Sequence, residues 1–216
     1  MRKLILNLIP ALLLSALVAR ADLVSFTNQG AFQAQGTIAY NSTFNDFGTD
    51  FSLPGAAFER GDVVYTSREN LIWGNATIFS NLSDSLIGNN YYTPITADLN
   101  TDTQYTMFGF QIAASGASTI TYTLYTNLAT YTFAGETVGN SLTGQTTFRG
   151  WTAGPGEFFY GIEIEAAPHD QVLAGLTHVQ VGTLGPVAPV PDASATAGLL
   201  GLALMGLAAV RRRARQ

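Results

Sequence analysis

Few residues of this chain have side chains whose type and spacing could support catalysis. The two histidines are His169 and His178, and there is no cysteine, which excludes thiol nucleophiles, iron–sulfur sites and zinc knuckles. Serines are abundant, but no Gly-x-Ser-x-Gly elbow occurs to expose one as a nucleophile. His169 and Asp170 follow a proline in a short polar stretch typical of a loop, and His178 alternates with Thr177 and Val179 as a surface position of a strand would. We predict no catalytic residue.

A second candidate is a metal site in the stretch from Asp98 to Gln104. Asp98, Asn100 and Asp102 place oxygen ligands at alternate positions, as a calcium loop does. A calcium loop needs glycine at its sixth position and a bidentate glutamate at its twelfth, where this chain has Thr103 and Gly109. We therefore interpret the stretch as an acidic connector, keep the three residues only as weak metal candidates, and predict no cofactor.

Aromatic residues provide the third kind of chemistry, the stacking of flat rings on the faces of sugars. Trp73, Tyr91, Tyr92 and Trp151 could form such a platform, with Trp73 and Trp151 as the glycan contacts. Aromatic side chains also fill the cores of β-sandwiches. The sequence leaves both interpretations open.

The segment that must position these residues has a dominant hydrophobic period of two. In 118–126, Ile120, Tyr122 and Leu124 alternate with threonines, which predicts a half-buried strand. A hairpin is expected to connect it to a strand that begins at Thr130. In 157–165 the alternation places Phe158, Tyr160, Ile162 and Ile164 on one face and Glu163 and Glu165 on the other.

Further strands are expected near residues 23–27, 37–40, 62–66, 71–79, 104–112 and 177–183, separated by glycine- and asparagine-rich turns. No stretch of ten residues has a helical period. Eight or nine short strands with frequent turns predict one all-β domain over 22–185, an antiparallel β-sandwich or jelly roll.

The net charge of this domain restricts the classes of partner that it can bind. Between Asp22 and Pro189 there are three arginines, no lysine and fourteen acidic residues, a net charge of about −11. Such a surface repels phosphate backbones, so we expect no nucleic-acid partner.

The N-terminal 21 residues have the order of parts of a secretory signal peptide. Arg2 and Lys3 precede a mainly apolar stretch over 4–19, and Ala19, Arg20 and Ala21 form a small-x-small cleavage site. We predict cleavage between Ala21 and Asp22. An N-terminal core helix or membrane anchor is the alternative.

The C-terminus predicts a membrane-spanning segment with its basic flank in the cytoplasm. Residues 193–210 carry no charge and as a helix would span about 27 Å, close to the roughly 30 Å of a bilayer core. The basic tail 211–216 follows directly, and such clusters stay on the cytoplasmic side. The proline-rich linker 186–192 keeps the segment apart from the β domain. A buried core helix is the alternative.

This C-terminal arrangement resembles the sorting signal of PEP-CTERM proteins, which are exported by Gram-negative bacteria and processed by exosortases. Val190, Pro191 and Asp192, followed by an apolar helix with Thr196 at its entry, are similar to the VPDSG-CTERM variant. The resemblance implies that Pro191 and Asp192 are recognised and that Arg211, Arg212 and Arg213 form the retention cluster. Ala193 and Ser194 depart from the Ser-Gly of the variant, which leaves the cleaved bond open.

Together these observations predict an exported, non-enzymatic protein of the cell surface or extracellular matrix. The chain is expected to pass through a single-pass membrane intermediate, held by the bilayer, before an exosortase-like enzyme processes it. The resemblance implies a role in biofilm or envelope, with exopolysaccharide as a partner. A carbohydrate-binding module of the cell surface is the alternative. A secreted hydrolase is disfavoured because no paired carboxylates or nucleophile motif can be placed.

Overall fold

The computed structural model describes residues 23–46, 52–74, 85–88, 94–100, 102–116, 118–167 and 173–186. The chain divides into two compact units, Met1–Leu184 and Gly185–Gln216, and every described helix and strand lies in the first. Its elements are β1 (Val24–Phe26), α1 (Gln29–Gln33), β2 (Gly36–Ser42), β3 (Ser52–Arg60), β4 (Val63–Gly74), β5 (Ser85–Gly88), β6 (Ile95–Leu99), β7 (Met107–Ala114), β8 (Thr119–Thr126), β9 (Thr130–Thr137), β10 (Gly139–Asn140), a 3₁₀ turn (Ser141–Thr143), β11 (Thr147–Thr152), β12 (Phe159–Ala167) and β13 (Ala174–Leu184).

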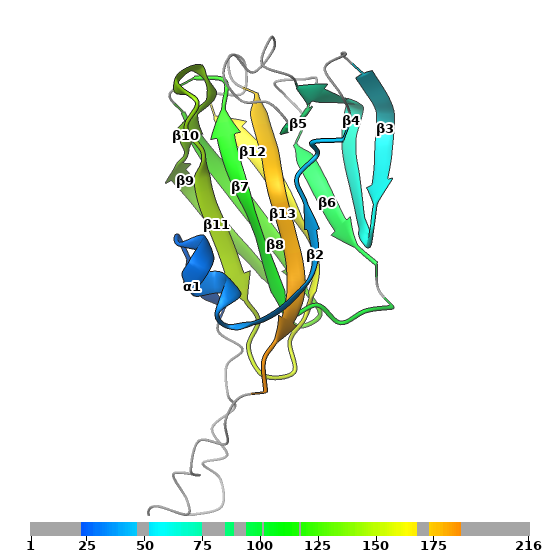
Figure 1. Cartoon of the computed structure of the whole chain (residues 1–216), viewed down its shortest axis with the longest axis vertical. Coiled ribbons are helices and arrows are strands. Elements are labelled where there is room, and N and C mark those ends of the chain that lie inside the picture. Colours follow the sequence, from blue (N-terminus) through cyan, green and yellow to red (C-terminus); the bar gives the residue numbers. More distant parts are fainter. Residues whose placement is uncertain are drawn as a thin grey trace, which may run out of the picture. The chain divides into compact units, whose positions relative to one another are not determined.

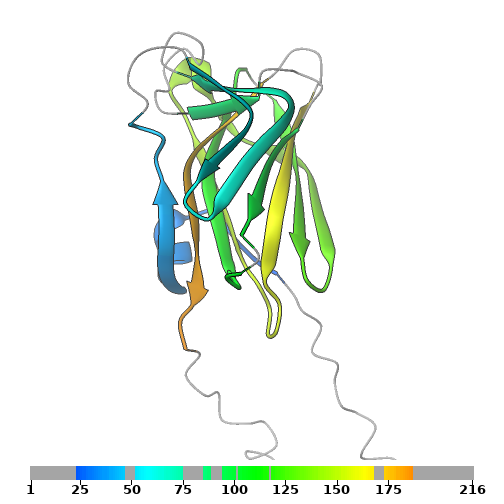
Figure 2. The ribbon, with the colours of Figure 1, turned by 90° about the vertical axis from the view of Figure 1, so that its right-hand side faces the viewer.

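These strands form one antiparallel sheet that folds over on itself into a sandwich (Figures 1 and 2). The strand order is β1-β11-β7-β13-β5-β4-β6-β12-β8-β9, with β2 on β13, β3 on β4 and the short β10 parallel to β7. Strand β5 pairs with both β13 and β4 and so connects the two layers. The expected all-β antiparallel sandwich is thereby confirmed.

The core between the layers is built from the alternating apolar positions of the strands. Ile120, Tyr122 and Leu124 of β8 are each 0% exposed and face inward, as the sequence pattern predicts. The opposite layer contributes Phe108, Phe110 and Ile112 of β7, Trp151 of β11, and Leu176, Val179 and Val181 of β13. Because each sheet buries one face against the other, β8 keeps a period of two, whereas β7 and β13 are buried at almost every position.

A smaller apolar cluster covers the outer face of β7 and β11. Helix α1 begins after Asn28, whose side chain accepts a hydrogen bond from the backbone N–H of Ala31 at 2.9 Å. It places Phe32 against Phe148, with ring centroids 5.4 Å apart. A Cβ on Gly150 would lie 2.8 Å from the Phe32 ring, so this glycine makes room for the helix.

Each of the two open edges of the sandwich is closed by an arginine. At the edge between β2 and β3, Arg60 pairs with Asp46 and lies over the ring of Phe44, 5.5 Å from its centroid. At the edge between β11 and β9, Arg149 pairs with Glu136. Among the described strands no hydrogen-bonded ladder joins β2 to β3 or β11 to β9, and these side-chain contacts connect the edges instead.

Three details of the expected fold are corrected. The strands expected over 62–66 and 71–79 are one continuous strand, β4. Strands β3, β5, β6, β10 and β11 and helix α1 were not expected. A β-bulge between Phe159 and Gly161 interrupts the alternation of β12, so Phe159 is buried and Tyr160 is 41% exposed. The expectation that Phe158 and Tyr160 share the inner face of Ile162 and Ile164 is wrong, because the extra residue of the bulge turns that end of the strand.

Candidate functional site

A pocket of about 170 Å³ lies at the β11–β9 edge of the sandwich. Its walls include Tyr122, Phe133, Glu136, Arg149 and Trp151, contributed by β8, β9 and β11. Arg149 and Trp151 are two residues apart on β11 and therefore share its inner face. Tyr122 and Phe133 are paired across β8 and β9. The pocket thus lies where the facing sides of the two layers meet the open edge.

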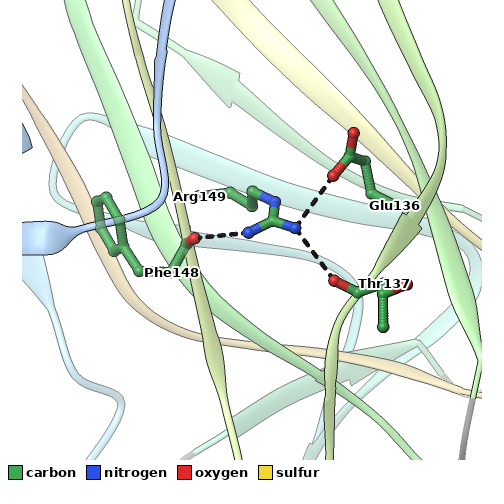
Figure 3. A network of polar contacts seen from close by, with 4 residues as sticks. All are labelled: Glu136, Thr137, Phe148 and Arg149. Atoms are coloured by element: carbon green, nitrogen blue, oxygen red, sulfur yellow. Dashed lines mark hydrogen bonds and ion pairs between the residues drawn. The ribbon is translucent and has the colours of Figure 1, made fainter.

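The polar groups at this edge bind one another. Nη2 of Arg149 donates to Oε2 of Glu136 at 3.0 Å and to the carbonyl of Thr137 at 3.1 Å, and Nη1 donates to the carbonyl of Phe148 at 3.2 Å (Figure 3). The side chains of Arg149 and Glu136 are 15% and 39% exposed. Because the guanidinium already has a carboxylate and two carbonyl partners, its first role is to tie β9 to β11.

The floor of the pocket consists of packed aromatic rings. Trp151 is 1% exposed and lies 5.5 Å from Tyr122 and 5.7 Å from Phe133, measured between ring centroids. Burial raises the pKa of the Tyr122 hydroxyl well above its ordinary value. Tyr122 Oη and Trp151 Nε1 have no hydrogen-bond partner within the described part of the chain. The floor is apolar packing with two buried polar atoms, and its Trp151 and Tyr122 rings are too buried for stacking on a sugar.

A second feature lies on the outer face of the other layer, and we call it the tyrosine surface: Tyr125, Phe158 and Tyr160 with the carboxylates of Asp98 and Glu163. Tyr125 is 36% and Tyr160 41% exposed, and no other aromatic side chain described in the structure is among its exposed large apolar residues. Gly161 pairs with Tyr125 on one side and with Asp98 on the other. The rings and the carboxylates are therefore neighbours on three adjacent strands.

Hydrogen bonds set the electrostatics of the tyrosine surface. The hydroxyl of Tyr125 donates to Oε2 of Glu163 at 3.0 Å. Partial burial, this hydrogen bond and the charges of Glu163 and Asp98 together raise the pKa of Tyr125, and burial raises the pKa of Asp98. A Cβ on Gly161 would lie 2.9 Å from Oδ1 of Asp98. The glycine leaves room for that carboxylate beside the ring of Tyr125.

The loops that carry these rings are tied together at one end of the sandwich. The backbone N–H of Asn127, in the β8–β9 hairpin, donates to the carbonyl of Phe158 at 3.1 Å, and its side-chain oxygen accepts from the N–H of Phe158 at 2.8 Å. Asn127 Nδ2 donates to the carbonyl of Gly156 at 3.1 Å. Figure 2 shows the hairpin and the β11–β12 connection next to each other at the lower end.

The structure separates the aromatic residues that the sequence suggested for glycan contact. Trp151 belongs to the core, so it does not present a ring face to a sugar; in this respect the sequence-based suggestion is corrected. Trp73 lies on β4, but its side chain, like Tyr91 and Tyr92, is outside the described residues. Alternation could have identified Tyr125, since it continues the outward series of Thr119, Thr121 and Thr123. Alternation could not have identified Tyr160, because the bulge interrupts it at this residue.

The weak metal candidates do not converge on one point. Asp98 lies within β6, and Oδ1 of Asn100 accepts a hydrogen bond from the backbone N–H of Asp102 at 3.1 Å. Among the described residues, no group of three or more His, Asp or Glu side chains could hold a metal ion. This arrangement is a turn at the end of a strand.

Of the two histidines, the structure describes His178, whereas His169 and Asp170 lie outside its described ranges. His178 is partly exposed at a bulge of β13, with φ of 50° and its Nδ1 3.0 Å from Oγ1 of Thr177. It contacts no carboxylate in the described hydrogen bonds.

The residues of the two terminal segments also lie outside the described ranges. They are Ala21 and Asp22 at the expected cleavage site, Val190, Pro191 and Asp192 of the sorting motif, and Arg211, Arg212 and Arg213 of the retention cluster. In the described ranges no helix is long and apolar enough to cross a membrane, and residues 193–210 are not among them.

Fold and sequence together define an all-β antiparallel sandwich followed by a C-terminal sorting signal of PEP-CTERM type. The signal is identified by a family model described as the VPDSG-CTERM motif, which matches residues 189–214. The resemblance stated from the sequence is thereby confirmed for this segment. No curated protein matches the chain.

Solved structures similar to this chain include two carbohydrate-binding modules. A variant of CBM29-2 has 12% sequence identity and a TM-score of 0.39, covering 65% of this chain and 99% of its own. The CBM22-1 xylan-binding domain from Paenibacillus barcinonensis Xyn10C has 12% identity and a TM-score of 0.38, covering 70% and 97%. At these scores the similarity carries no conclusion about a ligand.

Proposed function

We propose that this chain is an exported, non-enzymatic protein of the cell surface or extracellular matrix. In this proposal, residues 1–21 direct export, 193–210 hold the chain in the inner membrane, and an exosortase-like enzyme cuts near Pro191 and Asp192. The observation that carries it is the match of residues 189–214, which follow the β-sandwich in the sequence, to the VPDSG-CTERM motif. The protein would act in the biofilm or the cell envelope.

The physical properties of the C-terminal segment support this order of events. Residues 211–213 are three consecutive arginines, and positive charges next to an apolar span resist translocation, so the chain stops there. Three prolines in 186–191 keep the linker extended. An extended, exposed segment is what a processing enzyme can bind. The β-sandwich then lies on the outer side of the membrane, ready for release or transfer.

Processing makes a direct prediction for the mass of the released protein. We expect protein recovered from the cell surface or medium to lack residues 1–21 and Arg211, Arg212 and Arg213, as measured by intact mass spectrometry. A chain with Pro191 and Asp192 both changed to alanine should accumulate in the membrane fraction with its arginines retained. The matched control is Val187→Ala, which leaves all three prolines of the linker in place and should still be cut. Surface-released protein that retains Arg211–Arg213 would contradict the proposal.

Carbohydrate binding by the sandwich is the second candidate function. The observation that favours it is the tyrosine surface, where exposed rings lie beside carboxylates that can accept hydrogen bonds. Apolar ring faces with a few well-placed polar groups are the common composition of ligand sites. We expect the full chain, solubilised in a detergent without a sugar headgroup, to bind a subset of probes on a glycan array. Binding to none of them would leave the surface protein without this function.

A further inference from the structure

We propose that the tyrosine surface binds a neutral glycan chain, with the rings of Tyr125 and Tyr160 stacking on its sugars and Asp98 and Glu163 accepting hydrogen bonds from its hydroxyls. This inference rests on carbohydrate binding, the second candidate function, and adds to it a site and a class of ligand. It assigns a role to residues that sequence reasoning did not select.

The exposure of the two rings is the first argument. Tyr160 is 41% exposed. Phe159 just before it and Ile162 two residues after it are each only 1% exposed. The bulge between Phe159 and Gly161 produces this orientation, and bulges are common where a side chain is re-aimed next to a functional site. A regular strand would have buried an aromatic ring at this end of β12. The local backbone instead presents it to the outside.

The rigidity of the surface is the second argument. The rings of Phe158 and Tyr160 are in edge-to-face contact, with centroids 5.2 Å apart and planes at 85°. Phe158 is itself fixed to the β8–β9 hairpin through two hydrogen bonds with Asn127. The hydroxyl of Tyr125 is fixed by Glu163. A site whose side chains are held before binding loses less entropy when a ligand arrives.

The arrangement of the carboxylates is the third argument. Asp98, Gly161 and Tyr125 lie directly opposite one another on β6, β12 and β8, so the backbones of Asp98 and Tyr125 are two strand spacings apart, about 10 Å. Gly161 between them has no side chain to interrupt the row. The row therefore crosses three strands, and a chain of sugars can contact more of it than a single sugar can.

The charge of the surface decides between neutral and acidic glycans. Asp98 and Glu163 lie on the same outer face, and Glu165 follows two residues after Glu163 on the same strand. The domain between Asp22 and Pro189 carries about −11 in total. A polymer of uronic acids would meet like charges at every one of these positions. Neutral sugars provide hydroxyl donors for the carboxylates without this repulsion.

The test compares variants of the full chain, solubilised as above, by isothermal titration calorimetry with neutral hexasaccharides of glucose, mannose and xylose and with an oligogalacturonate. We expect Tyr160→Ala and Tyr125→Ala each to weaken binding of the preferred neutral probe by about tenfold, or 1.4 kcal/mol. Tyr160→Phe keeps the ring and should bind within about threefold of the unmodified chain, since stacking does not need the hydroxyl. The affinity of Tyr125→Phe should lie between those of the unmodified chain and Tyr125→Ala, because this variant loses only the hydrogen bond to Glu163.

The control is Leu142→Ala, which removes another exposed apolar side chain, 53% exposed, next to β10 at the opposite end of the sandwich (Figure 1). It should not change the affinity. Thermal unfolding of each variant checks that the fold is intact, because the two tyrosines are exposed and their replacement should cost little stability.

The possible outcomes distinguish a failure of carbohydrate binding from a failure of the tyrosine surface as its site. If the unmodified chain binds no neutral probe, carbohydrate binding fails as a function and the proposal fails with it. If the unmodified chain binds and both alanine variants bind equally well, the function survives and the tyrosine surface is overturned as its site. Stronger binding of the oligogalacturonate would overturn the neutral class. Dimerisation that Tyr160→Ala abolishes, with no glycan effect, would identify the surface as an interface between copies of the chain.

Discussion

Replacing Glu157 with alanine is expected to lower the free energy of unfolding by about 3 kcal/mol, because it removes the acceptor of a buried hydrogen-bond cluster. Glu157 is 1% exposed. Its Oε1 accepts from the hydroxyl of Thr126 at 2.6 Å and from that of Tyr131 at 2.9 Å, while Oε2 accepts from the backbone N–H of Gly154 at 3.3 Å. One carboxylate therefore connects β8, β9 and the β11–β12 connection.

The size of the effect follows from what the substitution leaves behind. The hydroxyl of Thr126 has a single proton and can donate it to the carbonyl of Ala129 instead, so the loss falls mainly on the hydroxyl of Tyr131 and the backbone N–H of Gly154, which both lose Glu157 as their acceptor. A buried donor without a partner costs about 1–3 kcal/mol. Glu157→Gln retains one carbonyl acceptor in the same place and should cost roughly half as much as alanine.

Urea unfolding followed by circular dichroism measures these differences. Glu59→Ala is the matched control, since Glu59 is exposed on β3, and it should change stability by less than about 0.5 kcal/mol. Equal stability of Glu157→Ala and Glu59→Ala would show that the cluster contributes nothing to the fold. Glu157→Ala should also weaken glycan binding at the tyrosine surface, because Phe158 directly follows Glu157 in the β11–β12 connection.

Hydrophobic alternation predicted much of this fold because each layer of a sandwich buries one face of its strands. Strands β8, β9, β12 and β13 lie where the pattern places them, and Ile120, Tyr122 and Leu124 of β8 face the core as expected. The C-terminal sorting signal could be recognised for a different reason, since its motif, apolar segment and arginines are contiguous in the sequence. Local patterns were sufficient for both.

Features that depend on contacts between distant strands could not be predicted in this way. The alternation in 157–165 extends through Phe158 and Tyr160, and only the pairing of β12 with β8 creates the bulge that turns Tyr160 outward. Arg149 and Glu136 carry no local signal that they close the sandwich edge. Strand β11 was missed because Arg149 and Gly150 interrupt its apolar run, while its pairing with β7 and β1 holds it in the sheet.

The expected effect of replacing Trp151 depends on whether its ring lies in the core or at the surface. From the sequence, Trp151 could be a glycan contact or a core residue. The structure places it in the core, 1% exposed, with its ring centroid 5.7 Å from those of Phe110 and Phe133. Trp151→Ala is therefore expected to lower the free energy of unfolding by about 4 kcal/mol, as large-to-small substitutions of buried aromatic residues do.

Two measurements on the same variant distinguish the core role from a binding role. Urea unfolding should show the loss of stability, and Trp151→Phe, which keeps an aromatic ring, should lose less because a smaller cavity remains. At a temperature where Trp151→Ala is still folded, its affinity for the preferred neutral hexasaccharide should equal that of the unmodified chain. Tyr160→Ala should give the reverse result, with stability kept and affinity lost. A Trp151→Ala variant of unchanged stability that no longer binds glycan would place the contact at the β11–β9 edge instead, because the ring would then have to leave the core to meet its ligand.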